Sequence, residues 1–247
     1  MSGHSKWHTI KHKKGALDAK RGKLFTRLIK EIVIAARNGG DPDANPRLRT
    51  AIAAAKAVSM PQDNIKRAIM RGTGELQGDT LEEMMFEGYG PGGVAVLVAV
   101  ATDNRNRTVA EIRHLFSKNG GNMGAEGSVA WMFKRRSQIL IEKGKAGEEQ
   151  LLALILEAGG DDLQDQGETW RILSDPSAHD AMVETLSRAG IETLEAAISF
   201  VPDTYVKLDG AQARAMLKLS EALEEHDDVQ SVYSNFDFDP AEVEAVA

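Results

Sequence analysis

The residues with the clearest chemical potential are concentrated at the start of the sequence, where lysine, arginine and histidine crowd the stretch from Gly3 to Lys30. Cations at this density are the groups with which proteins contact phosphates and displace counterions from a nucleic acid. Trp7 lies among them and could either stack on an unpaired base or cover the core of a helical domain. We therefore predict a nucleic-acid-binding segment. Its candidate contact residues are Lys6, Trp7, Lys11, Lys13, Lys14, Lys20, Arg21, Lys23, Arg27 and Lys30.

Charge is segregated along the chain, although the formal net charge of the 247 residues is −7. Up to Glu75 there are 16 Lys and Arg against 6 Asp and Glu, and the remainder has 14 against 31. This asymmetry indicates a polyanionic partner for the basic end, with a solvated charged surface as the alternative. The acidic remainder would repel nucleic acid from other faces and could dock a basic protein partner.

A second cationic pattern lies in the segment TDNRNRT, from Thr102 to Thr108, where a predicted strand ends and a helix begins. Backbone amides at a helix start, together with Arg105 and Arg107, could form a secondary anion site. Turn-forming Asn and Asp residues with solvated arginines explain the same pattern equally well.

The sequence shows no arrangement of residues that predicts catalysis. Asp103 and Glu111 are the acids nearest to the arginines, and a turn and a helix cap account for both. We therefore expect no catalytic residues and no enzyme. A metal-dependent nuclease that uses Asp103 is the alternative.

Two further patterns resemble ligand-binding motifs. His4, His8 and His12 are spaced so that a helix would align them as metal ligands, but the segment lacks helical periodicity and a nearby carboxylate. The G-x-G-x-x-G run from Gly88 to Gly93 precedes a predicted strand. A dinucleotide-binding loop with this motif instead follows a strand and begins a helix. We therefore predict no metal and no cofactor.

Composition is that of an ordinary globular protein, with 42% hydrophobic and 27% charged residues. There is no cysteine, which excludes disulfides and thiolate chemistry. The start of the sequence lacks the apolar region of a signal peptide, and the longest apolar run, Val94 to Ala101, is too short to span a membrane. These features predict a cytoplasmic protein.

Hydrophobic periodicity predicts a helical region after a mobile basic arm at residues 1–16. Apolar residues from Leu24 to Ala36 recur at steps of three and four, and cations occupy the opposite face. Asn45 and Pro46 predict the start of a second helix. Ser59-x-x-Gln62 resembles a capping box for a third. Residues 17–75 are thus predicted to form a three-helix domain, followed by a linker.

The pattern then changes to strands alternating with helices. We predict a buried strand at 94–101, a helix that Thr108-x-x-Glu111 caps, and a strand at 128–133. Residues 136–203 follow the order βαββαβ of a ferredoxin-like domain. A last helix and strand need a sheet to join, and the sheet containing 94–101 is the nearest.

The predicted fold class is therefore α+β. An N-terminal three-helix domain precedes two α/β (ferredoxin-like) domains, and the third domain is inserted in the second. The predicted boundaries are 1–16 for the arm, 17–75 for the helical domain, 80–135 plus 204–238 for the second domain and 136–203 for the insert.

Long motifs in the sequence resemble the YebC family. They are GHSKW (3–7), DAKRGKLF (18–25), GGDPDANPRLR (39–49), FEGYGPGGVA (86–95), DNRNRTVAEIRH (103–114) and GSVAWMF (127–133). The family includes bacterial probable transcriptional regulators and the mitochondrial translational activator of cytochrome c oxidase. The resemblance implies three domains and a non-enzymatic protein that binds nucleic acid.

The sequence and the resemblance together predict a regulator of gene expression, with a DNA-binding transcriptional regulator as the first hypothesis. The alternative is a ribosome-associated translation factor that binds ribosomal or transfer RNA and relieves stalling, for example at consecutive prolines. Phosphate contacts do not separate these roles, because both polymers present the same backbone charge.

Overall fold

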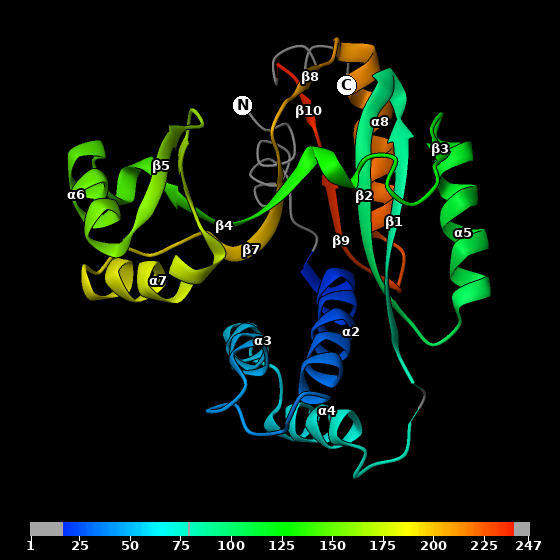
Figure 1. The fold of residues 1–247 in the computed structure, drawn as a ribbon, viewed down its shortest axis with the longest axis horizontal. Helices are drawn as coiled ribbons and strands as arrows, with labels where there is room; N and C mark the ends of the chain where they lie inside the picture. Colours follow the sequence, from blue (N-terminus) through cyan, green and yellow to red (C-terminus); the bar gives the residue numbers. More distant parts are fainter. Residues whose placement is uncertain (1–16, 79, 240–247) are drawn as a thin grey trace.

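The computed structural model describes residues 17–78 and 80–239, with side chains from Gly22 onward. In this part of the chain, three helices come first, and two antiparallel sheets with their covering helices follow (Figure 1). The predicted α+β fold class is confirmed. The predicted arm at residues 1–16 lies outside the described part of the chain.

The helical region is built around one apolar cluster. Its helices are α2 (Leu17–Ala36), α3 (Pro46–Ala57) and α4 (Gln62–Thr73). Ile32, Leu48 and Ile65 are at most 1% exposed at its centre. α4 approaches α2 so closely that a Cβ on Gly72 would lie 2.4 Å from the carbonyl oxygen of Val33, and only glycine fits there.

The two predicted helix starts in this region had different outcomes. Asn45 caps α3 as predicted, because its side chain accepts a hydrogen bond from the backbone N–H of Leu48 at 3.1 Å. The predicted capping box at Ser59 is wrong. Ser59 has a left-handed backbone (φ 58°) and its N–H bonds back to Lys56, so it ends α3, while Pro61 precedes α4 without a side-chain cap.

The first sheet has the strand order β3-β1-β2-β9. Its strands are β1 (Glu82–Gly90), β2 (Val94–Thr102), β3 (Asn122–Met123) and β9 (Val229–Ser234). The helices α5 (Arg105–Lys118) and α8 (Gly210–Glu224) pack on one face, against Val96 and Val98 of β2. Leu97 faces the other side and packs on Val129 and Phe133. β2 is therefore the central buried strand that the sequence predicted.

Three expectations for this region were wrong. β1 was not predicted, because its glycines and glutamates read as a turn. The predicted strand at 128–133 is a 3₁₀ turn, η2 (Ala130–Met132), from which the next strand begins. α5 starts at Arg105 with Asn104 as its cap, and Thr108 lies buried inside the helix instead of capping it.

The second sheet has the order β5-β6-β4-β7, and two helices cover one of its faces. The strands are β4 (Phe133–Glu142), β5 (Gly160–Asp165), β6 (Thr169–Ser174) and β7 (Glu195–Pro202), and the helices are α6 (Glu148–Ala158) and α7 (His179–Arg188). The predicted order βαββαβ is confirmed. The predicted boundary between residues 135 and 136 falls inside β4, and the division into domains remains a prediction.

The chain returns to the first sheet after β7. β8 (Val206–Lys207) pairs in parallel with β10 (Phe236–Asp237), and β9 pairs with β2, as predicted for the last strand. The short 3₁₀ turns η1 (Pro91–Gly93), η3 (Lys143–Lys145) and η4 (Pro176–Ala178) complete the described elements. Within the described ranges, none of the helices combines the length and apolarity that crossing a bilayer requires.

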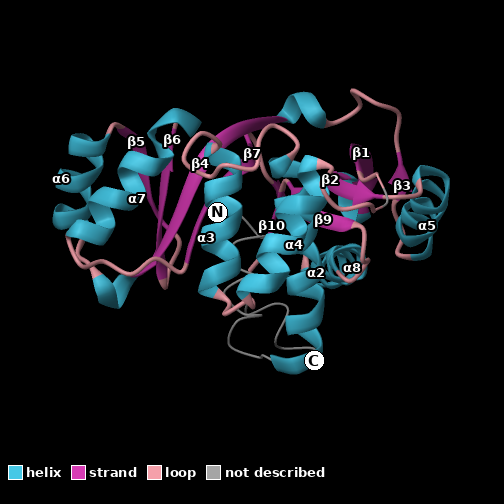
Figure 2. Cartoon of the chain, turned by 90° about the horizontal axis from the view of Figure 1, so that it is seen from below, coloured by secondary structure: helices cyan, strands magenta, loops and turns pink. Residues whose placement is uncertain are grey.

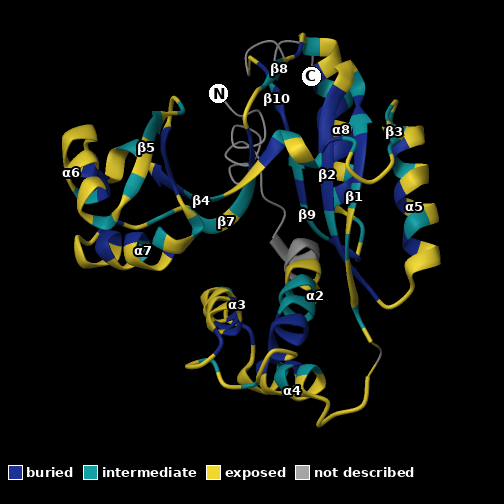
Figure 3. Cartoon of the chain, in the orientation of Figure 1, coloured by how far each residue is buried: buried dark blue, intermediate teal, exposed yellow. Residues whose placement is uncertain are grey.

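The helical region lies below the sheets in the view of Figure 1, and α3 and α4 come to the front when the molecule is seen from below (Figure 2). Colouring by burial shows that the outer faces of α3, α4 and α5 are turned to solvent (Figure 3). These surfaces are where a macromolecular partner has access.

Candidate nucleic-acid interface

The predicted contact residues fall into two groups. Lys6, Trp7, Lys11, Lys13 and Lys14 lie outside the described residues, and the side chains of Lys20 and Arg21 also lie outside them. The remaining three, Lys23, Arg27 and Lys30, are described on α2, and the structure brings them together at one place.

These three cations of α2 are directed at the end of α8 and the turn that follows it. Lys23 Nζ donates to the carbonyl oxygen of Glu225 at 2.8 Å, and the Arg27 guanidinium donates to the carbonyl oxygen of Glu224. The last carbonyls of a helix lack partners within the helix and carry partial negative charge, so cations stabilise them. Lys23 and Arg27 therefore connect α2 to α8, which packs on the first sheet.

Lys30 makes the most extensive of these contacts. Its Nζ lies 2.7 Å from Oδ1 of Asp228, and it also donates to the carbonyl oxygens of Ala101 and Asp227 at 3.1 and 3.0 Å. The side chains of Lys30 and Asp228 are only 15% and 7% exposed. An ammonium with three oxygen partners on a mostly buried side chain is held within the fold, and the role of Lys30 as a phosphate contact remains a prediction.

Asp228 is the centre of a hydrogen-bond cluster. Its Oδ2 accepts from the hydroxyls of Thr102 and Thr108 at 3.0 and 2.7 Å and from the guanidinium of Arg107 at 2.9 Å. Burial alone would raise the pKa of Asp228, but the hydrogen bonds from Lys30, Thr108 and Arg107 outweigh it and hold that pKa well below its usual value. The carboxylate is therefore charged in the folded protein.

The Asp228 cluster includes Arg107, one of the two arginines of the predicted secondary anion site. The Arg107 guanidinium lies between Asp228 and Asp103, at 2.9 and 3.0 Å, and the hydrogen bond with Asp228 is the main reason that its pKa is raised. Two carboxylates thus already engage Arg107, and its role in the secondary anion site remains a prediction. Arg105 is exposed at the start of α5, and its role as an anion contact remains a prediction.

The same cluster brings together Glu111, His226 and Asp228, whose potential metal-ligating atoms lie within 4.8 Å of one another. The chemistry of the site opposes a cation. Both oxygens of Asp228 already accept hydrogen bonds, and the charged groups of Lys30 and Arg107 lie beside them. The three residues are better explained as parts of the contact between α5, α2 and the turn that joins α8 to β9.

Three other cations of the helical region also have partners within the chain. Arg47 pairs with Glu31 at 2.8 Å and Glu83 at 2.6 Å, and these hydrogen bonds raise the pKa of its guanidinium, with Glu31 contributing most. The guanidinium of Arg37 donates to the carbonyl oxygen of Leu81, and that of Arg49 to backbone carbonyls of the preceding loop. These groups stabilise the fold.

α4 is different. Ile65 and Ala68 are buried on its inner face, while Lys66, Arg67 and Arg71 are exposed on its outer face. Among the described residues, none of these three side chains has a carboxylate or carbonyl partner. Lys56 at the end of α3 is likewise exposed. We call Lys66, Arg67 and Arg71 the α4 cationic face. These residues were not among the predicted contacts, although the amphipathic spacing of α4 could have shown them.

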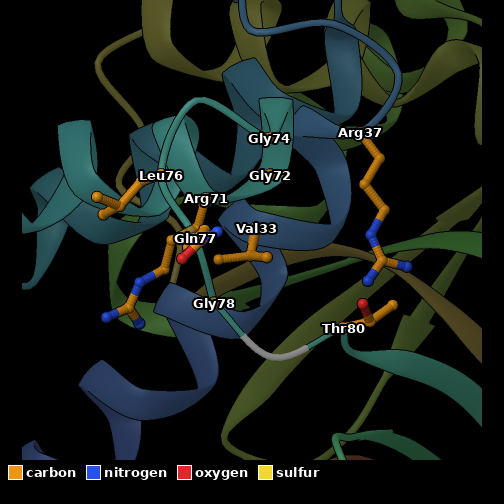
Figure 4. Close-up of a pocket in the computed structure, with 9 residues that line it drawn as sticks. All are labelled: Val33, Arg37, Arg71, Gly72, Gly74, Leu76, Gln77, Gly78 and Thr80. Carbon is orange, nitrogen blue, oxygen red and sulfur yellow. The ribbon is translucent and has the colours of Figure 1, made fainter.

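A cleft of about 690 Å³ borders this face, between the ends of α2 and α4 and the linker that follows. Arg37 and Arg71 both line it, but their guanidinium groups lie on opposite sides of the linker (Figure 4). Their charges do not converge on one small anion. The cleft therefore adjoins the α4 cationic face and does not form a separate binding pocket.

Ser137 and His179 form a buried pair in the second sheet region, with the Ser137 hydroxyl 2.8 Å from His179 Nδ1. Burial lowers the pKa of His179. A Ser–His contact is part of some nucleophilic sites, but Ser137 is 0% and His179 6% exposed, so a substrate cannot reach the hydroxyl. The pair satisfies two buried polar groups.

The fold and the cationic surface together define an α+β protein with helices at one end and two antiparallel α/β regions after them. The model described as the TACO1/YebC protein N-terminal domain matches residues 5–75, and the model described as the TACO1/YebC second and third domain matches residues 81–236. The chain therefore belongs to the TACO1/YebC family.

Close relatives share the full length of the chain. A protein of Solibacter usitatus named "probable transcriptional regulatory protein" is 68% identical over 247 residues and covers 100% of both chains. A Treponema pallidum protein of the same name is 57% identical over 244 residues, covering 98% of this chain and 99% of its own. The crystal structure of a conserved hypothetical protein from Aquifex aeolicus superposes with a TM-score of 0.82 at 46% identity, covering 90% and 92% of the two chains.

Proposed function

We propose that the chain is a nucleic-acid-binding regulator of gene expression, and more specifically a DNA-binding transcriptional regulator. The names of its full-length relatives support the regulatory part of the proposal. The observation that carries the binding part is the α4 cationic face, whose three side chains are exposed and unpaired among the described residues. Elsewhere in the described helical region, most lysines and arginines are bonded within the fold.

The binding step is electrostatic. Arg67 and Arg71 lie about one helical turn apart and Lys66 is adjacent to Arg67, so phosphates of a duplex backbone can contact all three while their counterions are released. The lysines of the predicted arm, Lys11, Lys13 and Lys14, supply further phosphate contacts in this proposal. Such contacts set affinity and orientation without reading bases, and the proposal requires no catalytic group and no cofactor.

The first test removes the α4 cationic face. The triple variant Lys66→Ala, Arg67→Ala, Arg71→Ala should bind duplex DNA at least about tenfold more weakly, and the slope of log K against log salt should become shallower by up to about 2.7. Its melting temperature should stay within about 1 °C of wild type, because the removed side chains are exposed. Fluorescence anisotropy at several salt concentrations measures both quantities.

The matched control removes the same number of positive charges from a different surface. Arg113, Lys118 and Lys218 are exposed on α5 and α8, and their replacement by alanine should leave the affinity within about twofold of wild type. Equal losses in both triple variants would show that only the overall charge matters, and would reject the α4 cationic face as the interface.

A second experiment separates DNA from the ribosome as the target. When a cell extract treated with a DNA-specific nuclease is sedimented through a sucrose gradient, a DNA-binding regulator should stay near the top. Co-migration with ribosomes after DNA removal, together with loss of that co-migration in the α4 triple variant, would reject the transcriptional role and support the translation-factor alternative. A footprint on defined promoter DNA would support the first hypothesis.

A further inference from the structure

Trp131 is a large apolar side chain in an unusual position. It is 72% exposed, whereas Trp170 is 8% exposed in the second sheet region. Its neighbours in the chain are buried or half-buried, with Val129 at 0% and Phe133 at 6%. The segment is thus well packed, but the side chain of Trp131 is exposed to solvent.

The backbone of this segment is held by a buried carboxylate. Glu87 of β1 is 5% exposed, and its two oxygens accept hydrogen bonds from the N–H groups of Gly127, Val129 and Ala130, each at 2.7 Å. A charged acceptor that binds three backbone donors fixes a turn strongly. The outward direction of the next residue is therefore a feature of the fold and does not result from a loose loop.

The indole ring is also oriented. Its Nε1–H donates to the carbonyl oxygen of Ser128 at 3.2 Å, and the hydroxyl of Tyr89 donates to the same oxygen at 3.1 Å. Because the polar edge of the ring is used within the chain, the part that Trp131 offers to a ligand is its aromatic face. Flat π-systems pack well on such a face.

Cations follow directly after this aromatic residue. Arg135 lies two residues beyond Phe133 on β4, is exposed, and has no hydrogen-bond or ion-pair partner among the described residues. Lys134 pairs with Asp203 at 3.1 Å, but both side chains are at least half exposed, so the pair is weak and exchangeable. An aromatic face followed by cations matches a ligand that carries both rings and negative charge.

We propose that Trp131 is a stacking site for an unpaired base of a single-stranded nucleic acid, with Arg135 contacting an adjacent phosphate. Charge complementarity selects this ligand over an apolar protein surface. Base stacking on an aromatic ring tolerates any sequence, because every base has a π-face. The inference rests on the proposed function and adds single-stranded segments to its ligands. In Figure 1, α4 lies at the bottom of the view and β4 starts well above it, beside the first sheet, so this contact is separate from the α4 cationic face.

The experiment uses the full chain with a 12-nucleotide oligouridine, a 12-nucleotide oligothymidine and a 12-base-pair duplex. Trp131→Ala should lose roughly tenfold in affinity for both single strands and less than twofold for the duplex. Trp131→Tyr should retain most of the affinity, because the ring is kept. Arg135→Ala should make the salt slope for the single strands shallower by about 0.7. Trp170→Phe is the control for tryptophan fluorescence, because Trp170 is 8% exposed and lies outside both proposed contacts, and the single strands should still quench the emission of Trp131 in this variant.

The possible results separate the inference from the proposed function. If Trp131→Ala and wild type bind the single strands equally while the α4 triple variant loses duplex binding, the stacking site is rejected and the proposed function stands. If wild type binds neither single strands nor duplex, both are rejected. If Trp131→Ala unfolds, the same comparison is made between Trp131→Tyr and Trp131→Leu. Equal affinity of those two variants for the single strands would also overturn the stacking site.

Discussion

Helices α2 and α4 belong to the same apolar cluster and both carry rows of cations, but they use those cations in opposite ways. On α2, Lys23, Arg27 and Lys30 are bonded to the end of α8 and to Asp228. On α4, Lys66 and its neighbours on the outer face have no such partners among the described residues. One row holds the molecule together, and the other remains available for a partner.

The difference arises from what lies opposite each row. The α2 face meets the carbonyl end of a 15-residue helix and a buried carboxylate, both of which attract cations. The α4 face meets solvent. Local cation density therefore does not identify a phosphate-binding surface. Cations that lack an internal counter-charge are the better indicator.

The largest effect is expected when the α2 row loses its counter-charge. Asp228→Asn keeps the size of the side chain but leaves Lys30 and Arg107 without the carboxylate that they share. Breaking a buried ion pair on one side should lower the free energy of unfolding by about 3 kcal/mol. Urea titration followed by circular dichroism measures this loss.

The neighbouring acid provides the control. Asp227 is exposed, and Lys30 contacts only its backbone carbonyl, so Asp227→Asn should change the free energy of unfolding by less than about 0.5 kcal/mol. Similar losses in the two variants would mean that the Asp228 charge does not hold α2 in place, and the comparison between α2 and α4 would fail.

A pH titration tests the same carboxylate without a mutation. The folded-state pKa of Asp228 lies below the ordinary value of 3.8, so its contribution to stability is complete above that value. As the pH falls below about 4, the unfolded chain takes up the proton first, and the contribution is lost progressively towards the folded-state pKa. The difference in melting temperature between wild type and Asp228→Asn should therefore be constant from pH 7 to about pH 5 and shrink in more acidic solution. A difference that stays constant down to pH 3 would exclude this linkage.

The parts of the fold that could be predicted are those with local signals. Asn45 and Pro46 have the residue types of a helix cap and a first-turn residue, and an apolar run such as 94–101 has to be buried on both faces. β1 lacked such a signal. Its pairing with β3 and its packing against α5 place Gly88 where Asn122 and Phe116 approach, so this glycine serves close packing and not a turn.

The contacts of the candidate site were harder to predict, because the residues that make them lie far apart in the sequence. Lys30 and Asp228 are 198 positions apart, and no spacing rule joins residues so distant. The family motif DNRNRTVAEIRH contains Arg107 and Thr108, but the structure shows that both serve the Asp228 cluster. Trp131 lies in another quoted motif, and its exposure depends on Glu87, 44 positions earlier on a strand that the sequence did not reveal.

The smallest expected effect compares one lysine from each row. Lys23→Ala removes a single hydrogen bond to the exposed end of α8, and it should lower the free energy of unfolding by about 0.5 kcal/mol without changing DNA affinity by more than about twofold. Lys66→Ala should do the reverse, leaving stability unchanged and weakening DNA binding by about threefold, because one phosphate contact is lost. Both variants lose one positive charge, so a general charge effect cancels between them. If Lys23→Ala weakens DNA binding as much as Lys66→Ala does, the α2 row also contacts phosphate, and the assignment of the two rows to separate roles is wrong.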